Sequence, residues 1–314
     1  GDITVIGGEL SDFTQETPTE YRATFTPTTD GATTIDVDGS AFRDSARNNN
    51  TAATQFNWTF NATSPTMTIT AIEVSDGDTS GYSSLSLTFT SSEATTNFTE
   101  GDITVSGGAL SDFAQISDTI YTAIFTPSSA LYKLKRFTSN DGVNVALYSV
   151  DEPTDPTTDG ATTIDVDGST FTDAYGNNNT AATQFNWTFN ATPPTMLITS
   201  AEVSNGDTSN DAALTMTFTS SEATTNFALG DITVIGGELS DFTQETPLKY
   251  TATFTPTTDG ATTIDVAAST FRDSAGNNNT AATQFNWTFN ATSPTLSSST
   301  PSDEATGVAV NANI

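Results

Sequence analysis

The chain alternates apolar and polar residues over short stretches, and the clearest example is a segment that occurs three times. At 185–189 three aromatic residues alternate with Asn186 and Thr188, and the same letters, FNWTF, return at 56–60 and 285–289. Alternation with a period of two predicts a β-strand with one buried and one solvent-facing side. Long stretches with the 3.6-residue period of an amphipathic helix are absent, so the pattern predicts an all-β protein.

Between about residues 65 and 192 the alternation predicts seven short strands. The expected ranges are 66–74, 83–91, 102–106, 109–113, 120–126, 161–167 and 182–190. Turn-forming Gly, Asn, Asp and Pro residues separate them. Short strands of this kind pack most naturally as two antiparallel sheets laid face to face, so we expect a β-sandwich.

Two strings of residues repeat at fixed spacings and set the organisation of the chain. GDITVIGG or GDITVSGG begins at Gly1, Gly101 and Gly230. TAATQFNWTFNAT begins at Thr51, Thr180 and Thr280. The spacings indicate a module of about 100 residues, of which the middle copy carries about 29 extra. This period exceeds those of solenoids and propeller blades and suits a self-contained sandwich.

The repeats divide the chain into four parts. We expect a partial module at 1–61 that lacks its first strands, complete modules at 65–192 and 194–292, and the start of a further module at 294–314. The extra residues of the middle module form an insertion at 128–156. The phase of the repeats favours a segment of a longer tandem array over a polymer whose subunits complete one another.

Charge and composition exclude several classes of protein. The chain has 38 acidic and 8 basic residues, for a formal net charge of −30, and cannot neutralise a phosphate backbone, so nucleic-acid binding is not expected. The absence of Cys and His removes thiol and imidazole catalysis, disulfides and the common zinc and haem sites. No apolar run approaches the roughly 20 residues of a membrane span.

The order of the motifs resembles the bacterial Ig-like repeats of large surface adhesins and biofilm proteins. These motifs are PTMTITAIEVSDGDTS, LSLTFTSSEATTNF, GDITVSGGALSDF, YTAIFTP, DGATTIDV and FTDAYGNNNTAATQFNWTF. The closing PSDEATGVAVNANI resembles the opening of a second bacterial Ig-like type. The resemblance implies tandem immunoglobulin-like β-sandwich modules, an extracellular or cell-surface location, a spacer or adhesive role, and frequently calcium at the module junctions.

Acidic residues supply the candidate site chemistry, because Ca²⁺ takes oxygen ligands. In an Ig-like sandwich the loops after the second and sixth strands share one pole, and the loop after the first strand lies at the other. The candidate ligands are Glu222, Asp231 and Asp273, which would face Asp76 and Asp78 of the preceding module across a junction. The alternative is that these residues cap turns and keep the surface soluble.

The insertion at 128–156 has a different chemistry from the rest of the chain. Two β-rich runs, 131–137 and 143–150, flank a turn-forming TSNDG, which is a hairpin signature. Its candidate contact residues are Tyr132, Lys133, Lys135, Arg136 and Tyr148. On so acidic a chain, a basic and aromatic hairpin suits a contact with another copy or a neighbouring module. The alternative is a loop insertion without a role.

Three classes of function remain. Repetition without a unique catalytic cluster favours a structural protein, namely a surface spacer, stalk or filament, over an enzyme. The alternative is a ligand-binding adhesin segment that recognises glycans or another cell surface. The expected partners are other copies of the chain or neighbouring modules, and calcium is the cofactor to test.

Overall fold

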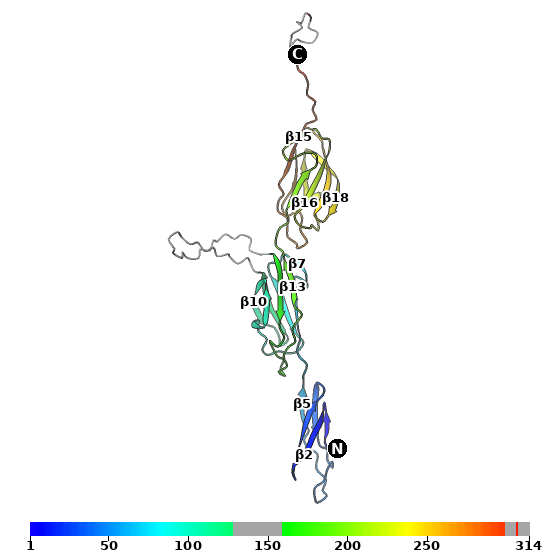
Figure 1. The fold of residues 1–314 in the computed structure, drawn as a ribbon, viewed down its shortest axis with the longest axis vertical. Helices are drawn as coiled ribbons and strands as arrows, with labels where there is room; N and C mark the ends of the chain where they lie inside the picture. Colours follow the sequence, from blue (N-terminus) through cyan, green and yellow to red (C-terminus); the bar gives the residue numbers. More distant parts are fainter. Residues whose placement is uncertain (128–158, 299–305, 307–314) are drawn as a thin grey trace, which may run out of the picture. The chain divides into compact units, whose positions relative to one another are not determined.

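The computed structural model describes residues 1–127, 159–298 and 306 (Figure 1). The regular secondary structure of these residues is β-strand apart from two short 3-10 helices, η1 (Glu100–Asp102) and η2 (Leu229–Asp231). The expected all-β class is therefore confirmed. The insertion at 128–156 and most of the segment at 294–314 lie outside the described residues.

The middle repeat forms a sandwich of two sheets. The strands of the first sheet, in the order β10-β11-β8-β6, are β6 (Met67–Ala71), β8 (Leu85–Ser91), β10 (Gly108–Gln115) and β11 (Ile120–Pro127). The longer strands of the second sheet, in the order β13-β12-β9, are β9 (Ile103–Ser106), β12 (Gly160–Val166) and β13 (Phe185–Phe189). A further strand, β7 (Thr79–Ser80), has two residues. The seven expected strands are all present, with shorter first and last members.

The third repeat has the same topology. Its first sheet, in the order β14-β16-β19-β18, contains β14 (Met196–Ser200), β16 (Leu214–Ser220), β18 (Gly237–Thr246) and β19 (Lys249–Pro256). Its second sheet, in the order β15-β21-β20-β17, contains β15 (Thr208–Ser209), β17 (Ile232–Ile235), β20 (Gly260–Val266) and β21 (Phe285–Phe289). Figure 1 labels β15, β16 and β18 in this repeat.

One strand pairing differs from the expected purely antiparallel sheets. After β14 the chain crosses to the second sheet, where β15 pairs in parallel with β21. The crossing turn is fixed to β21, because the Asn286 amide donates to the Asn205 side chain at 2.6 Å and the Gly206 amide donates to the Asn286 carbonyl at 2.7 Å. The alternation of residues does not report this crossing, since the pairing covers only two residues.

The inward-facing residues of each sandwich form its core. Phe185, Trp187 and Phe189 are buried while Asn186 and Thr188 are exposed, so the predicted alternation is confirmed. In the third repeat the ring of Phe227 meets those of Tyr250, Phe271 and Phe242 edge-on, with centroids 5.0–5.8 Å apart. Burying a large apolar side chain stabilises a fold by about 1.5–3 kcal/mol, so these rings dominate the stability of each sandwich.

The first repeat has the later strands of the module. They are β1 (Thr4–Ile6), β2 (Gly8–Thr17), β3 (Glu20–Pro27), β4 (Gly31–Asp36) and β5 (Phe56–Phe60). Its sheets are β2-β3 and β1-β4-β5, and within residues 1–61 no strand takes the places of β6 and β8. The inner face is correspondingly open: Phe56 is 62% exposed, whereas the matching Phe185 is 4% exposed.

By contacts, the chain forms two compact units. The first contains Gly1–Asp78 and Tyr82–Phe189, and the second contains Thr79–Gly81 and Asn190–Ile314. The first unit thus holds the first repeat and most of the middle one, and the second unit holds the third repeat and the linker before it.

Candidate functional site

Asp76 and Asp78 lie in the first unit, in the turn that follows β6. The Asp78 carboxylate accepts the Ser75 amide at 2.7 Å, which closes the turn. The Asp76 carboxylate accepts the Asn186 amide at 2.6 Å, which fixes the turn to β13. Both carboxylates therefore have structural partners in their own repeat, as the turn-capping alternative requires.

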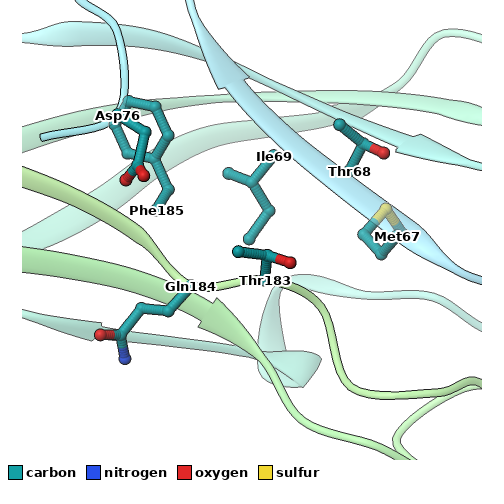
Figure 2. A pocket seen from close by; sticks show the side chains of 7 residues that line it. All are labelled: Met67, Thr68, Ile69, Asp76, Thr183, Gln184 and Phe185. Atoms are coloured by element: carbon teal, nitrogen blue, oxygen red, sulfur yellow. The ribbon is translucent and has the colours of Figure 1, made fainter.

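A small hollow lies beside Asp76, between β6 and the residues that lead into β13 (Figure 2). Its volume is about 150 Å³, and its lining residues are Met67, Thr68, Ile69, Asp76, Thr183, Gln184 and Phe185. Figure 2 shows Met67 and Ile69 on one strand, with Gln184 and Phe185 across from them. Asp76 is the one acidic residue among these lining residues.

Asp231 and Asp273 lie in the second unit and both close local turns. Asp231 accepts the Ala228 amide at 2.8 Å and so caps the start of η2. Asp273 is buried, and its two oxygens accept the backbone and side-chain amides of Asn277 at 2.8 and 2.9 Å. Both carboxylates thus accept amide hydrogen bonds within their own loops.

Asp173 occupies the same position in the middle repeat and shows the electrostatic balance of this turn. Burial acts to raise the pKa of the Asp173 carboxyl, because it removes water from the charged form. Hydrogen bonds from the Asn177 side chain and from the Asn177, Tyr175 and Gly176 amides outweigh burial and hold the pKa below its ordinary value of 3.8. The carboxylate is thus charged at neutral pH.

Glu222 has a partner that the sequence analysis did not single out. Its carboxylate accepts the side-chain amide of Asn190 at 3.1 Å, and Glu93 accepts that of Asn61 at 2.8 Å. Asn61 and Asn190 each follow directly after an FNWTF strand. The recurrence of Asn at this position in every repeat was the available signal.

In the part of the chain that the structure describes, the candidate calcium ligands are divided between the two units: Asp76 and Asp78 belong to the first, and Glu222, Asp231 and Asp273 belong to the second. No group of three or more acidic, His or Cys residues there is arranged to hold a metal ion. Calcium binding by Asp76, Asp78, Glu222, Asp231 and Asp273 stays a prediction, and so does the contact role of the insertion. The insertion residues Tyr132, Lys133, Lys135, Arg136 and Tyr148 lie outside the described residues.

Each linker between repeats has a regular local conformation. The side-chain oxygens of Asn61, Asn190 and Asn290 accept the amide two residues later, at 2.8, 3.0 and 3.1 Å. Since the oxygen is used in this turn, the side-chain nitrogens of Asn61 and Asn190 remain available as donors to Glu93 and Glu222.

Aspartates in the first and third repeats hold the linkers that follow them. Asp30 accepts the Ala62 amide at 2.9 Å and the Thr63 hydroxyl, and Asp259 accepts the corresponding groups of Ala291 and Thr292. The Thr63 and Thr292 hydroxyls, followed by the backbone amides, hold the pKa of these two carboxyls below 3.8.

Within the described residues no helix is long and apolar enough to cross a bilayer. A search of curated proteins finds no match to the chain. Among solved structures, invasin, a bacterial integrin-binding protein, is 16% identical over 91% of this chain and 52% of its own length, with a TM-score of 0.35. The Yersinia pseudotuberculosis adhesin InvE is 16% identical over 72% of this chain and 59% of its own, with a TM-score of 0.25.

A third similar structure is the Bacteroides ovatus protein SGBP-B, solved in complex with a mixed-linkage heptasaccharide. It is 15% identical over 92% of this chain and 60% of its own, with a TM-score of 0.18. The chain thus spans about half to three-fifths of the length of these proteins, and similarity at this level carries no functional argument.

The family comparison is more direct. The profile of the bacterial Ig-like domain matches residues 1–60, 61–145 and 190–289, which together make up most of the chain. The matched segments contain the strands of the first and third repeats, and those of the middle repeat from β6 to β11. The chain belongs to the bacterial Ig-like domain family.

Proposed function

We propose that this chain is a non-enzymatic structural segment of an extracellular or cell-surface protein, in which tandem sandwiches form a spacer or stalk. The observation that carries the proposal is the repetition of one fold. The middle and third repeats have the same strand order, and each has its own aromatic core. Repeated domains that each bury a core add length to a chain without requiring a unique site.

Surface labelling of the cells that produce the protein tests its location. An antibody raised against residues 194–292 should bind intact cells, and protease added outside those cells should remove the signal. An antibody signal that appears only after the cells are opened contradicts the proposal. Turnover of a substrate by the purified chain would contradict the non-enzymatic part.

A ligand-binding adhesin segment is the second candidate, and two exposed tyrosines of the middle repeat favour it. Tyr82 is 51% exposed and Tyr175 is 57% exposed, and the third repeat has Asp211 and Ala275 at the corresponding positions. Exposed aromatic rings unique to one repeat provide stacking surfaces for sugar rings. Binding of the chain to a glycan array, lost in Tyr175→Ala, supports this function, and an array without signal contradicts it.

Calcium is proposed as a stabilising cofactor of the same array, and it has a direct test. A ligand that binds only the folded state raises the melting temperature, and extracellular sites bind calcium at about 10⁻⁴–10⁻³ M. Addition of millimolar calcium should therefore raise the melting temperature, and Asp231→Asn with Asp273→Asn should reduce the rise. Identical melting with calcium and with chelator rejects the cofactor.

A further inference from the structure

The two complete repeats use the same pair of residues to hold the linker that precedes them. The Asn61 side-chain amide donates to the Glu93 carboxylate at 2.8 Å, and the Asn190 side-chain amide donates to the Glu222 carboxylate at 3.1 Å. Both pairs are partly buried and span 32 residues. Hydrogen bonds to a charged acceptor are stronger than neutral ones, and partial burial strengthens them further.

A second asparagine holds the backbone of the same linker residue. The Asn277 side chain donates to the Asn190 carbonyl at 2.9 Å, and the Asn177 side chain donates to the Asn61 carbonyl at 3.0 Å. The same side-chain nitrogens of Asn277 and Asn177 donate to the buried Asp273 and Asp173, each at 2.9 Å. The buried aspartate therefore orients the amide that receives the linker.

The end of each linker is fixed as well. The Thr180 amide donates to the Pro65 carbonyl and the Thr280 amide donates to the Pro194 carbonyl, both at 3.0 Å. The Thr195 amide donates to the Ser221 hydroxyl at 2.9 Å. The linker is thus held at its first and last residues by the module that follows it.

We propose that these groups form a linker latch, a surface on each complete module that recognises the Asn-Ala-Thr-x-Pro linker before it. The latch consists of Glu93 and Asn177 in the middle repeat and of Glu222 and Asn277 in the third. Its partner is any module of this type that ends in the same linker. The inference rests on the proposed array function. It states that hydrogen bonds between asparagine side-chain amides and glutamate carboxylates hold each linker.

The third linker supplies a matched control. Asn290 has the same kind of local turn, with its side-chain oxygen 3.1 Å from the Thr292 amide. It also follows a strand with the sequence FNWTF, as Asn61 and Asn190 do. Among the described residues, no glutamate is paired with its side-chain nitrogen. A change at Asn290 therefore alters the same kind of local turn while both pairs, Asn61–Glu93 and Asn190–Glu222, stay intact.

Exchanging donor and acceptor tests the pairing in the full chain. Asn190→Asp keeps the oxygen that accepts the Thr192 amide but places a second carboxylate against Glu222. Glu222→Gln on its own retains an acceptor for Asn190. The two changes combined restore a hydrogen bond with the roles reversed, because the glutamine amide donates to the new carboxylate.

Hydrogen exchange at the Thr195 and Thr280 amides, followed by mass spectrometry, reports on the docked linker. We expect exchange about tenfold faster in Asn190→Asp, since a hydrogen bond to a charged group contributes enough for roughly this change in an opening equilibrium. Exchange should return to near the parent rate in the double variant. Asn290→Asp should leave both amides unchanged, and Asn61→Asp should affect the Thr180 amide instead.

Two outcomes overturn the latch. One is equal exchange in Asn190→Asp and Asn290→Asp, and the other is failure of the double variant to recover. A chelator arm adds a third readout: protection that is retained in chelator supports amide–carboxylate pairing, and protection that is lost in chelator contradicts it. The purified chain answers these questions whether or not the surface-labelling experiment succeeds, so the failure of either proposal can be recognised separately.

Discussion

At the scale of single residues, the turn that carries Asp44, Asp173 or Asp273 shows how one position limits the choice of side chain. Gly176 and Gly276 have φ values of 91° and 92°, and Arg47 occupies the same position in the first repeat with a φ of 67°. A left-handed conformation costs an ordinary L-residue roughly 1–2 kcal/mol, and glycine is free of this penalty. The first repeat therefore carries local strain that the others avoid.

We predict that Arg47→Gly stabilises the first repeat by about 0.5–1 kcal/mol, because relief of the left-handed strain exceeds the greater freedom of glycine in the unfolded chain. The midpoint of urea unfolding, followed through Trp58 fluorescence, measures the change. Gly276→Ala serves as the reverse experiment and should destabilise the third repeat. An unchanged midpoint in both variants would show that the turn adapts to any side chain.

The linker aspartates predict a dependence on pH at the same scale. Hydrogen bonds from Thr63 lower the pKa of Asp30 in the folded state, so this stabilisation is present above the unfolded pKa and is lost as the pH falls through the folded pKa. We expect the amide signal of Ala62 in NMR spectra to titrate with a midpoint below 3.8. Asp30→Asn should abolish that titration while the Ala291 amide, held by Asp259, still titrates.

At the scale of strands, β18 and β19 approach each other so closely at Gly237 that a larger residue does not fit there. A Cβ on Gly237, the first residue of β18, would lie 2.4 Å from the Phe254 ring and 2.5 Å from the Thr255 carbonyl. Both contacts are far shorter than van der Waals distance, and Phe254 is fully buried. The ring therefore has no free space into which it could move.

We predict that Gly237→Ala destabilises the third repeat by about 1–3 kcal/mol, the usual cost of overpacking a core. Gly230→Ala is the control, since a Cβ there meets nothing within 4 Å. Urea unfolding followed by tryptophan fluorescence measures both variants. Equal midpoints for the two variants would mean that β18 moves away from Phe254 at little cost.

The open face of the first repeat gives a second prediction for strands. Residues 230–237 repeat the sequence of residues 1–8, and residues 194–229 contain β14 and β16. Fusing a copy of 194–229 ahead of Gly1 should therefore add two strands to the sheet β2-β3, next to β3. These strands should bury Tyr21 and Phe56. Each large apolar side chain buried contributes about 1.5–3 kcal/mol.

Trp58 is partly exposed and provides the measurement, because its emission shifts to shorter wavelength when the inner face is covered. The first repeat should also unfold at a higher urea concentration than in the parent chain. A fusion with serine in place of the copied Leu214 and Phe218 is the control and should give neither change. If the Trp58 emission and the urea midpoint of the control change equally, the added length of chain is responsible for these changes and the packing of Leu214 and Phe218 is not.

At the scale of the whole molecule, the insertion at 128–156 lies in the sequence between two strands of one module. β11 ends at Pro127 and β12 begins at Gly160, whereas only 257–259 join the corresponding strands of the third repeat. Deletion of 128–156 leaves Thr-Thr-Asp between these strands, which is the sequence at 257–259. The shortened connection therefore already exists in a folded repeat.

We predict that the sandwiches of the deletion variant still fold. Their free energy of unfolding should stay within about 0.5 kcal/mol of the parent value, as is usual for changes in connecting loops. If the insertion makes the proposed contact between copies, self-association of the parent chain will be lost in the variant. Sedimentation at several concentrations measures association, and circular dichroism checks the fold. Equal association of both chains would leave the insertion without this role.

The sequence by itself determined the class of fold, the repeat period and the inward-facing aromatic residues. Strand alternation is a local property with a period of two, so Phe185, Trp187 and Phe189 could be assigned to one face without knowledge of their partners. The strings that begin at Gly1, Gly101 and Gly230 likewise aligned the repeats, and their unequal spacings showed that the middle repeat carries an insertion. These signals are encoded in neighbouring residues or in direct repetition.

The tertiary structure decided how the acidic residues are used. A carboxylate in a loop accepts whichever amide the folded loops bring to it, and the partner of Glu222 is Asn190, 32 residues away. The crossing that pairs β15 with β21 likewise depends on contacts between Asn205 and Asn286 that no local pattern encodes. The sequence therefore showed only that aspartates recur at the same positions of the repeats. The folded loops showed that these aspartates accept hydrogen bonds from amides, because hydrogen-bond partners are set by proximity in space.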